Sequence, residues 1–314
     1  MANLPESLFV ESSEPSPSTS GANPNPTETK TATLEQLILA LQKDQSRERA
    51  LFLLSKKRGD DLAPLLWNSF GTVFTLLQEI TATYRILSSP DLIARASTRV
   101  CNALALLQCI ASHPDTRMLF VKANIPFYLY PFLSTTNKEK HYEYLRLTSL
   151  GVIGALVKVD DPEIIYFLLK SEIFPYCLRC MEVGNELSKT VATFIIQKIL
   201  MHDKGLEYCC TFVERFLAVS RVLGIMVEQL AEEPSVRLLK HIIRCYLRLS
   251  ESPRTCEGLR GSIPVRLRDN TFINLLRDDP IAMGWLQQLF YNVTTVEQSK
   301  TQPAGGSYGR LIRG

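Results

Sequence analysis

No stretch of the sequence is both apolar enough and long enough to span a membrane. A transmembrane helix needs roughly 18 or more consecutive apolar residues, and the run from Leu150 to Val157 is only as long as a packed helix requires. The first lysine is Lys30, so the chain opens without the basic region of a signal or transit peptide. We therefore expect no membrane association, and a location in the cytoplasm, the nucleus or both.

The sequence also has few residues arranged for catalysis. It contains no glycine-rich nucleotide-binding loop and no His-Glu-x-x-His metalloprotease motif. Cys177 and Cys180 have the spacing of a zinc-ligand pair, but neither a second pair nor a histidine follows at zinc-finger distance. We expect a protein that is not an enzyme and that binds no metal or cofactor, with Cys177 and Cys180 packed in the core.

Neither the cysteines nor the net charge indicate an unusual environment or ligand. The eight cysteines mostly fall within apolar helical patterns, where reduced cysteine acts as a small hydrophobic residue. The formal net charge is +3, which is too small by itself to indicate a polyanionic partner. Hydrophobic residues make up 46% of the chain, so most of it can bury a core.

Two segments poor in large apolar residues flank this core-forming part. Residues 1–31 are rich in serine and proline, and residues 297–314 contain several glycines with little periodicity. Such compositions are typical of disordered tails. We therefore expect the folded domain to occupy residues 32–296.

The folded part shows one helical pattern after another and no convincing strand. A long apolar helix opens with a basic residue four times, at offsets of 47, 43 and 48 residues: Arg99, Arg146, Lys189 and Arg237. A polar break and a shorter helix follow each time. A period of about 40–47 residues with two or three helices per unit is the signature of HEAT or armadillo repeats, which bury their apolar faces by stacking. The sequence predicts an all-α, armadillo-like α-solenoid.

The helix predicted over residues 143–158 contains two glycines that need an explanation. A glycine inside a helix costs about 1 kcal/mol relative to alanine. Gly151 and Gly154 are easier to explain if something approaches the backbone closely there. That neighbour is either a packed helix or a ligand.

A candidate peptide-binding stripe runs through this helix. On a 3.6-residue period, Tyr144, Thr148 and Gly151 share one face, and Val191 follows one repeat later. If the long helix of each unit lines a concave groove, as it does in the armadillo architecture, a peptide helix or strand could lie close to this small, partly aromatic wall. Tight helix stacking explains the same residues equally well.

A second candidate surface is a basic stripe on one predicted helix, made of Arg237, Lys240, His241, Arg244 and Arg248. Their spacing places them on one face. With Arg99, Arg146 and Lys189 they could form a basic track for single-stranded nucleic acid or an acidic peptide. The alternative is an ordinary solvated face, with charges paired to Glu232, Glu233 and Glu251.

Four segments resemble a known family: Arg99–Cys109, Glu143–Lys158, Glu186–Phe194 and Arg237–His241. The resemblance as a whole covers about residues 33–296. The family is the Rcd-type "required for cell differentiation" family, the armadillo-repeat subunit of the Ccr–Not mRNA deadenylase complex. The resemblance implies a right-handed superhelix of about six armadillo-like repeats. It also implies a non-catalytic adaptor that docks on the Not scaffold and recruits RNA-associated regulators, so that separate nucleases shorten poly(A) tails.

The resemblance assigns particular residues to binding surfaces. Tyr144, Gly151 and Val191 match the family's groove positions, where short peptide motifs of regulators bind, and Thr148 lies on the same stripe. For the scaffold contact, Phe70 is retained, whereas the three other positions differ in residue type from animal members: Asn68, Phe74 and Thr81.

Two further properties follow from the resemblance. Animal members have pockets for tryptophan side chains; Arg215 keeps an arginine of that pocket, but Val213 replaces a tyrosine, and the loss of an aromatic wall weakens such a pocket. Direct binding of single-stranded nucleic acid and formation of homodimers are also attributed to the family.

Overall fold

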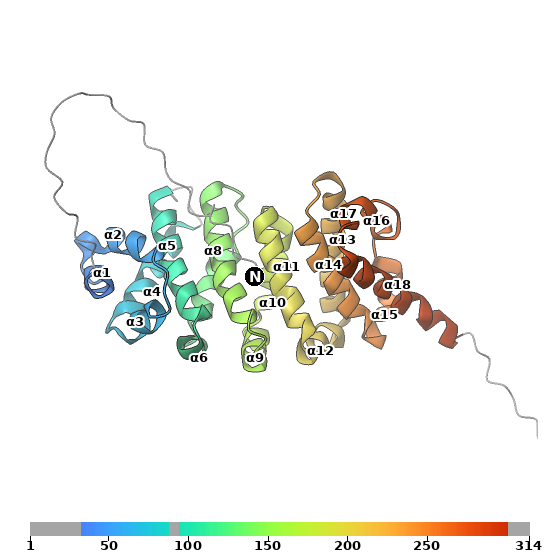
Figure 1. Ribbon diagram of the computed structural model, residues 1–314, viewed down its shortest axis with the longest axis horizontal. Coiled ribbons are helices and arrows are strands. Elements are labelled where there is room, and N and C mark those ends of the chain that lie inside the picture. The colour runs from blue at the N-terminus through green and yellow to red at the C-terminus, as the bar shows by residue number, and fades with distance from the viewer. Residues whose placement is uncertain (1–32, 88–93, 301–314) are drawn as a thin grey trace, which may run out of the picture. The chain divides into compact units, whose positions relative to one another are not determined.

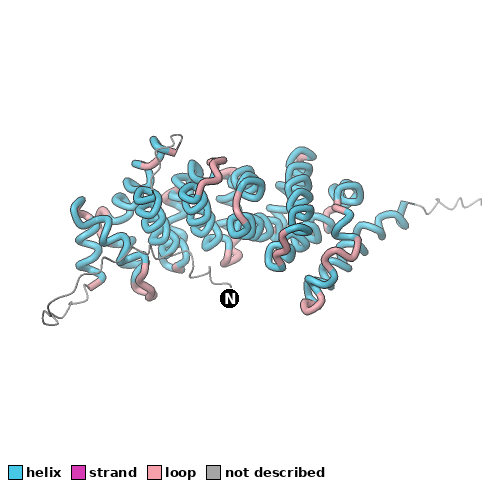
Figure 2. The backbone as a smooth tube through the Cα atoms, turned by 90° about the horizontal axis from the view of Figure 1, so that it is seen from above, coloured by secondary structure: helices cyan, strands magenta, loops and turns pink. Residues whose placement is uncertain are grey.

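The computed structural model describes residues 33–87 and 94–300, with side chains as far as Thr294 in the last helix. The predicted tail 1–31 lies outside the described residues, as does 301–314. The helical unit that begins at Leu34 is described here by itself. Helices account for all regular secondary structure in the described residues (Figure 2).

The first half of this unit carries the long helices α2, α5 and α8 with shorter helices between them. The elements are α1 (Leu34–Leu41), α2 (Asp44–Ser55), α3 (Leu62–Asn68), α4 (Thr72–Ala82), η2 (Tyr84–Ile86), α5 (Ala94–Ser112), α6 (Pro114–Lys122), η3 (Ile125–Leu129), α7 (Tyr130–Leu133) and α8 (Lys140–Val157).

The second half continues the same alternation. Its elements are α9 (Pro162–Lys170), α10 (Ile173–Val183), α11 (Glu186–Met201), α12 (Asp203–Thr211), α13 (Val213–Glu232), α14 (Val236–Ser250), α15 (Pro253–Ser262), α16 (Val265–Arg268), α17 (Ile273–Leu276) and α18 (Pro280–Lys300). The last helix continues to Lys300, beyond the boundary of 296 expected from the sequence.

One helix from each repeat packs against its counterpart in the next. The helices α2, α5, α8, α11, α14 and α18 contact one another in chain order, and Figure 1 shows α5, α8, α11 and α14 side by side. Within the described residues this series has six members. The prediction of an all-α solenoid is confirmed.

Local sequence explains where the helices begin. Proline occupies the first position of α6, α9 and α15, where its missing N–H costs nothing. Polar side chains cap the helix starts: Asp161 Oδ1 accepts a hydrogen bond from the Glu163 N–H at 2.9 Å, and Asn185 Oδ1 accepts one from the Ser188 N–H at 2.9 Å. The polar breaks between repeats therefore act as helix-start signals.

The core lies between the stacked long helices. Leu104, Leu150, Ile195 and Ile242 have no exposed surface. Burial of each such side chain stabilises the fold by about 1.5–3 kcal/mol. No helix within the described ranges is both long and apolar enough to cross a bilayer.

Candidate functional site

The most accessible stripe of α8 carries the predicted peptide-binding residues. Thirteen of the eighteen residues of α8 are buried. Tyr144 and Thr148 are half-buried, and Gly151, one turn further along, is buried. Val191 is half-buried on the neighbouring helix α11. We call Tyr144, Thr148, Gly151 and Val191 the α8–α11 face.

Local contacts fix the side chains of this face. The Thr148 hydroxyl donates to the Tyr144 carbonyl at 2.7 Å. The Lys140 ammonium lies 5.6 Å from the centre of the Tyr144 ring, within cation–π range. Burial raises the pKa of the Cys101 thiol, which hydrogen-bonds with Thr148, to about 11, so this thiol is neutral. The face therefore combines an aromatic ring with small, neutral groups.

The two glycines of α8 are placed differently. A Cβ atom at Gly154 would lie 3.6 Å from Val191 Cγ1, which is ordinary van der Waals contact. Helix stacking therefore leaves room for a methyl group at Gly154 and excludes only larger side chains. Gly151 lies on the stripe of Tyr144 and Thr148, as the period predicted.

A buried ion pair holds α8 against its neighbours. Arg146 has no exposed surface, and its Nη2 atom lies 2.6 Å from Glu143 Oε2. The guanidinium also donates to the carbonyl of Thr135 at 2.7 Å and to that of Asn137 at 3.0 Å. The other oxygen of Glu143 accepts the Asn185 N–H, at the start of α11, at 3.1 Å. This network sets the spacing of α8 and α11, and so positions the face between them.

The proposed basic track is wrong at Arg146, because a guanidinium without exposed surface cannot meet a ligand. Arg99 is also occupied, since it forms an ion pair with the buried carboxylate of Glu79. Lys189 is half-buried and donates to Gln229 Oε1 at 2.6 Å. The structure also corrects their place, because α5 begins at Ala94 and α8 at Lys140, more than one turn before Arg99 and Arg146. The repeated basic residues therefore act largely within the protein.

The basic stripe on α14 is mostly compensated as well. Lys240 pairs with Asp279, and Arg248 pairs with Glu251 and, at 2.6 Å, with Asp203. The Arg244 guanidinium lies 5.0 Å from the ring of Trp285. Arg237 is exposed. The alternative to a nucleic-acid track, a solvated face whose charges are paired, is confirmed for the pair of Arg248 with Glu251.

His241 does not contribute positive charge, which corrects its assignment to the stripe. Its Nδ1 atom lies 2.6 Å from Gln197 Oε1, and its ring packs edge-on against Phe194 with centroids 5.6 Å apart. Burial, assisted by the cations Arg237 and Lys240, lowers the pKa of His241 to about 4. The imidazole is therefore neutral at pH 7.

This histidine predicts a pH dependence of stability. In the unfolded chain His241 titrates near pH 6.5, about where a free histidine does. Between pH 6.5 and 4 the unfolded state binds the extra proton, so stability is full above that range and falls as the pH falls. We expect a loss of about 2 kcal/mol at pH 5 relative to pH 7. A His241→Gln variant should lose less on the same acidification. Thermal melting of both proteins at the two pH values measures this, and equal losses would contradict it.

The predicted scaffold-binding residues lie at the corner between α3 and α4. Phe70 is 100% exposed and Phe74 is 70% exposed, which is unusual for phenylalanine. Asn68 ends α3, and Thr81 is two turns beyond Phe74 on the same face of α4. We call Asn68, Phe70, Phe74 and Thr81 the Phe70 surface.

Backbone geometry presents Phe70 to solvent. The next residue, Gly71, has φ = +73°, in the left-handed region that favours glycine, and it is the residue immediately before α4. The Phe70 carbonyl accepts a hydrogen bond from Gln42 Nε2 at 3.3 Å. The turn is therefore anchored while the aromatic ring projects outward.

Around Arg215 the structure shows aromatic residues that the sequence analysis missed. Its guanidinium lies 3.7 Å from the centre of the Tyr208 ring and 4.7 Å from that of Phe212. Val213 is 64% exposed. Arg215 thus has aromatic neighbours although residue 213 is a valine. The signal was available as Tyr208 and Phe212, seven and three residues before the arginine.

The cysteine pair with zinc-like spacing is part of the core. Cys177 and Cys180 have no exposed surface and are free thiols. Burial raises the pKa of Cys180 to about 12. The expectation of core packing is confirmed.

Comparisons with solved structures define the class of protein. An engineered protein matches with a TM-score of 0.61 and 13% identity, over 84% of this chain and 100% of that chain. A designed armadillo repeat protein in complex with the peptide (KR)4 matches with a TM-score of 0.58 and 15% identity, over 83% of this chain and 100% of that chain. At these identities the likeness concerns the fold, which is that of an armadillo-repeat solenoid.

Sequence comparisons then give the family. A family model described as "Cell differentiation family, Rcd1-like" matches residues 37–293. The "Cell differentiation protein rcd1" of Schizosaccharomyces pombe is 57% identical over 261 residues, covering 82% of this chain and 92% of that protein. "Protein CAF40" of Saccharomyces cerevisiae is 54% identical over 255 residues, covering 80% of this chain and 68% of that protein. The chain belongs to the Rcd1-like cell differentiation family, as its motifs predicted.

Proposed function

We propose that this protein is a non-catalytic adaptor subunit of the Ccr–Not complex. It docks on the Not scaffold and recruits RNA-associated regulators, which leads to deadenylation, mRNA decay and translational repression. Membership of the Rcd1-like family supports the proposal. The observation that carries it is the fully exposed Phe70 on a fold whose other large side chains are mostly buried.

The Phe70 surface is suited to a stable protein interface. Two phenylalanine rings that are 100% and 70% exposed leave a large apolar area in water. Such area marks interaction sites, and buried aromatic anchors dominate the energy of interfaces. The carboxamide of Asn68 and the hydroxyl of Thr81 provide a polar rim. We therefore assign scaffold docking to this surface.

The α8–α11 face is assigned to regulator peptides. Beyond its first two residues helix α8 is buried except along its outer stripe, so that stripe is the part that can meet a ligand. The Tyr144 ring offers an apolar contact, and Gly151 allows a backbone to approach closely. Its position on different helices from the Phe70 surface permits both partners to bind together.

A pull-down with the Not scaffold tests the docking assignment. The full chain should retain a recombinant scaffold fragment, and Phe70→Ala should weaken retention by roughly tenfold or more, because truncation of a central aromatic anchor costs 2 kcal/mol or more. Phe127→Ala is a matched control, since Phe127 is another exposed phenylalanine (46%) on a different element, η3.

Tethering the protein to a reporter mRNA separates docking from recruitment. Wild type should shorten the poly(A) tail of the reporter, and Phe70→Ala should not. A variant of the α8–α11 face should remain active, because tethering replaces the regulator. Failure of both wild type and Phe70→Ala to retain the scaffold would exclude the proposal.

Direct binding of nucleic acid receives less support from the structure. The basic stripe retains Arg237 as an exposed cation without a described ion pair, while His241 is neutral and Lys240 and Arg248 are paired. An adaptor of this kind acts where mRNA is processed and degraded, and we propose that it is present in both the nucleus and the cytoplasm.

A further inference from the structure

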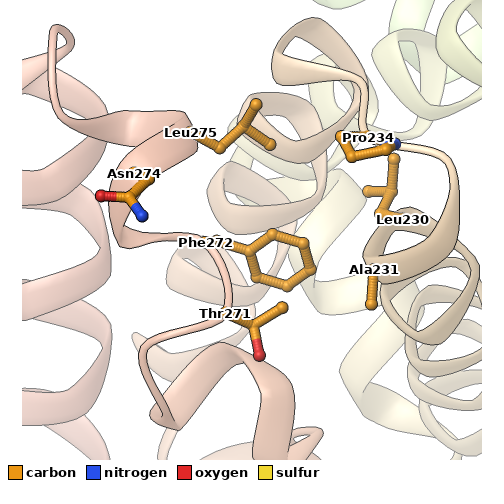
Figure 3. Close-up of a pocket in the computed structure, with 7 residues that line it drawn as sticks. All are labelled: Leu230, Ala231, Pro234, Thr271, Phe272, Asn274 and Leu275. Atoms are coloured by element: carbon orange, nitrogen blue, oxygen red, sulfur yellow. The ribbon is translucent and has the colours of Figure 1, made fainter.

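A pocket outside both assigned surfaces lies between the C-terminal end of α13 and the segment that forms α17. Its volume is ≈ 330 Å³. Leu230, Ala231 and Pro234 form one wall, and Phe272 and Leu275 form the other (Figure 3). None of these residues belongs to the α8–α11 face or to the Phe70 surface.

The interior of the pocket is apolar. Phe272 and Leu230 are only 3% and 2% exposed, so they form its floor. In Figure 3 the Phe272 ring points toward Ala231 on the α13 wall. The volume is at the lower end of the range of about 300–1,000 Å³ that is typical of ligand sites. This space suits one large apolar side chain better than an extended ligand.

The rim of the pocket is acidic. Glu232 and Glu233 are exposed and lie between the lining residues Ala231 and Pro234. They form no ion pair within the described part of the chain, although Glu233 is near enough to Lys189 to act on its pKa. The 20-residue helix α13 also ends here, and the free carbonyl groups of a helix C-terminus carry partial negative charge. Both features favour a cation close to the α13 wall.

The opposite side adds one charge of each sign. Beyond Leu275 the chain continues through Arg277 and Asp278, both exposed. The guanidinium of Arg277 donates to Asn274 Oδ1, a residue that lines the pocket.

We propose that this pocket binds a short peptide segment in which a large apolar side chain is next to a lysine or arginine. The apolar side chain fills the space over Phe272, and the basic side chain meets Glu232, Glu233 and the end of α13. An apolar anchor beside a complementary charge gives both affinity and orientation. This site is independent of the assigned adaptor surfaces and gives the protein a second peptide specificity.

Selection from a random library of short peptides displayed on phage tests the proposal. The full wild-type chain is the target, and an Ala231→Trp variant is used for counter-selection, because an indole at this half-buried helical position fills the pocket. Enriched peptides should carry an apolar residue next to lysine or arginine. Their Kd, measured by fluorescence anisotropy, should rise roughly tenfold or more in Ala231→Trp and roughly threefold to tenfold in the double variant Glu232→Lys, Glu233→Lys.

A charge reversal elsewhere provides the control. Glu163→Lys on α9 reverses one exposed acidic residue, half the charge change of the double variant, and should leave the Kd unchanged. Melting curves must show that all variants fold. Recovery of no peptide, equal binding to Ala231→Trp, or enriched peptides without a basic residue would each overturn the proposal. Peptides whose binding is lost in Val191→Glu but kept in Ala231→Trp would also overturn the proposal, because they would bind the α8–α11 face.

Discussion

Replacing Arg146 with methionine is expected to lower the free energy of unfolding by about 3–5 kcal/mol, because removing one partner leaves a buried charge without compensation. The substitution leaves Glu143 buried beside an apolar side chain, and it also removes the donors to the Thr135 and Asn137 carbonyls. For a domain of this size the loss corresponds to a fall in Tm on the order of 10 °C. Thermal and urea unfolding of the full chain measure it.

An exposed ion pair gives the matched control. Arg95 binds Glu48 through contacts as short as 2.7 Å, but the two side chains are 76% and 38% exposed. Such pairs contribute at most about 1 kcal/mol, so Arg95→Met should change the Tm little. The double variant Glu143→Leu, Arg146→Met should recover part of the lost stability, since no charge remains buried. A fall of less than about 1 kcal/mol in Arg146→Met would contradict the role assigned to this pair.

Arg146 also shows what periodicity cannot determine. Its recurrence at matching places in successive repeats identified the repeat correctly, but the position of a residue within a repeat does not say which way its side chain points. The direction depends on the neighbouring loop, whose carbonyls at Thr135 and Asn137 accept the guanidinium. One local signal was present. Glu143 precedes Arg146 by three residues, and opposite charges at this spacing in an apolar helix favour an internal pair.

The stacking of repeats was predictable for a physical reason. Each unit must bury an apolar face on the next, so the apolar pattern recurs with the period of the fold. That pattern identified the long helices that pack in series. The stripe of Tyr144, Thr148 and Gly151 on α8 follows from the same helical geometry.

Turns and contacts between repeats were harder to predict. Asn124 and Glu172 adopt left-handed backbone conformations with φ near +58° and +56°, at equivalent places before η3 and α10. Neither residue is glycine, so the sequence gives a weak signal for this conformation. The compensation of the basic stripe depends on Asp203 and Asp279, which lie 45 and 39 residues from their partners. Pairs so distant in sequence become visible only once the repeats are stacked.

Substituting Gly151 with tryptophan is expected to abolish the binding of regulator peptides while the fold is retained. An indole at this position would cover the α8–α11 face next to Thr148 and prevent a peptide backbone from approaching. Loss of a central contact region costs at least about 2–3 kcal/mol, so the Kd of a bound regulator peptide should rise by roughly a hundredfold. Fluorescence anisotropy with peptides from regulators that co-purify with the wild-type complex measures this change.

Gly154→Ala is the matched control, because it lies in the same helix only three residues away. Its new Cβ would make an ordinary 3.6 Å contact with Val191, so we expect unchanged peptide binding and stability higher by about 0.5–1 kcal/mol. Val191→Glu should weaken the binding of the regulator peptide without affecting the binding of the scaffold, because Val191 belongs to the same face but lies on α11. Circular dichroism decides between the two explanations of Gly151: an unfolded Gly151→Trp protein would show that the glycine serves helix packing, whereas a folded protein that no longer binds would show that it serves the ligand.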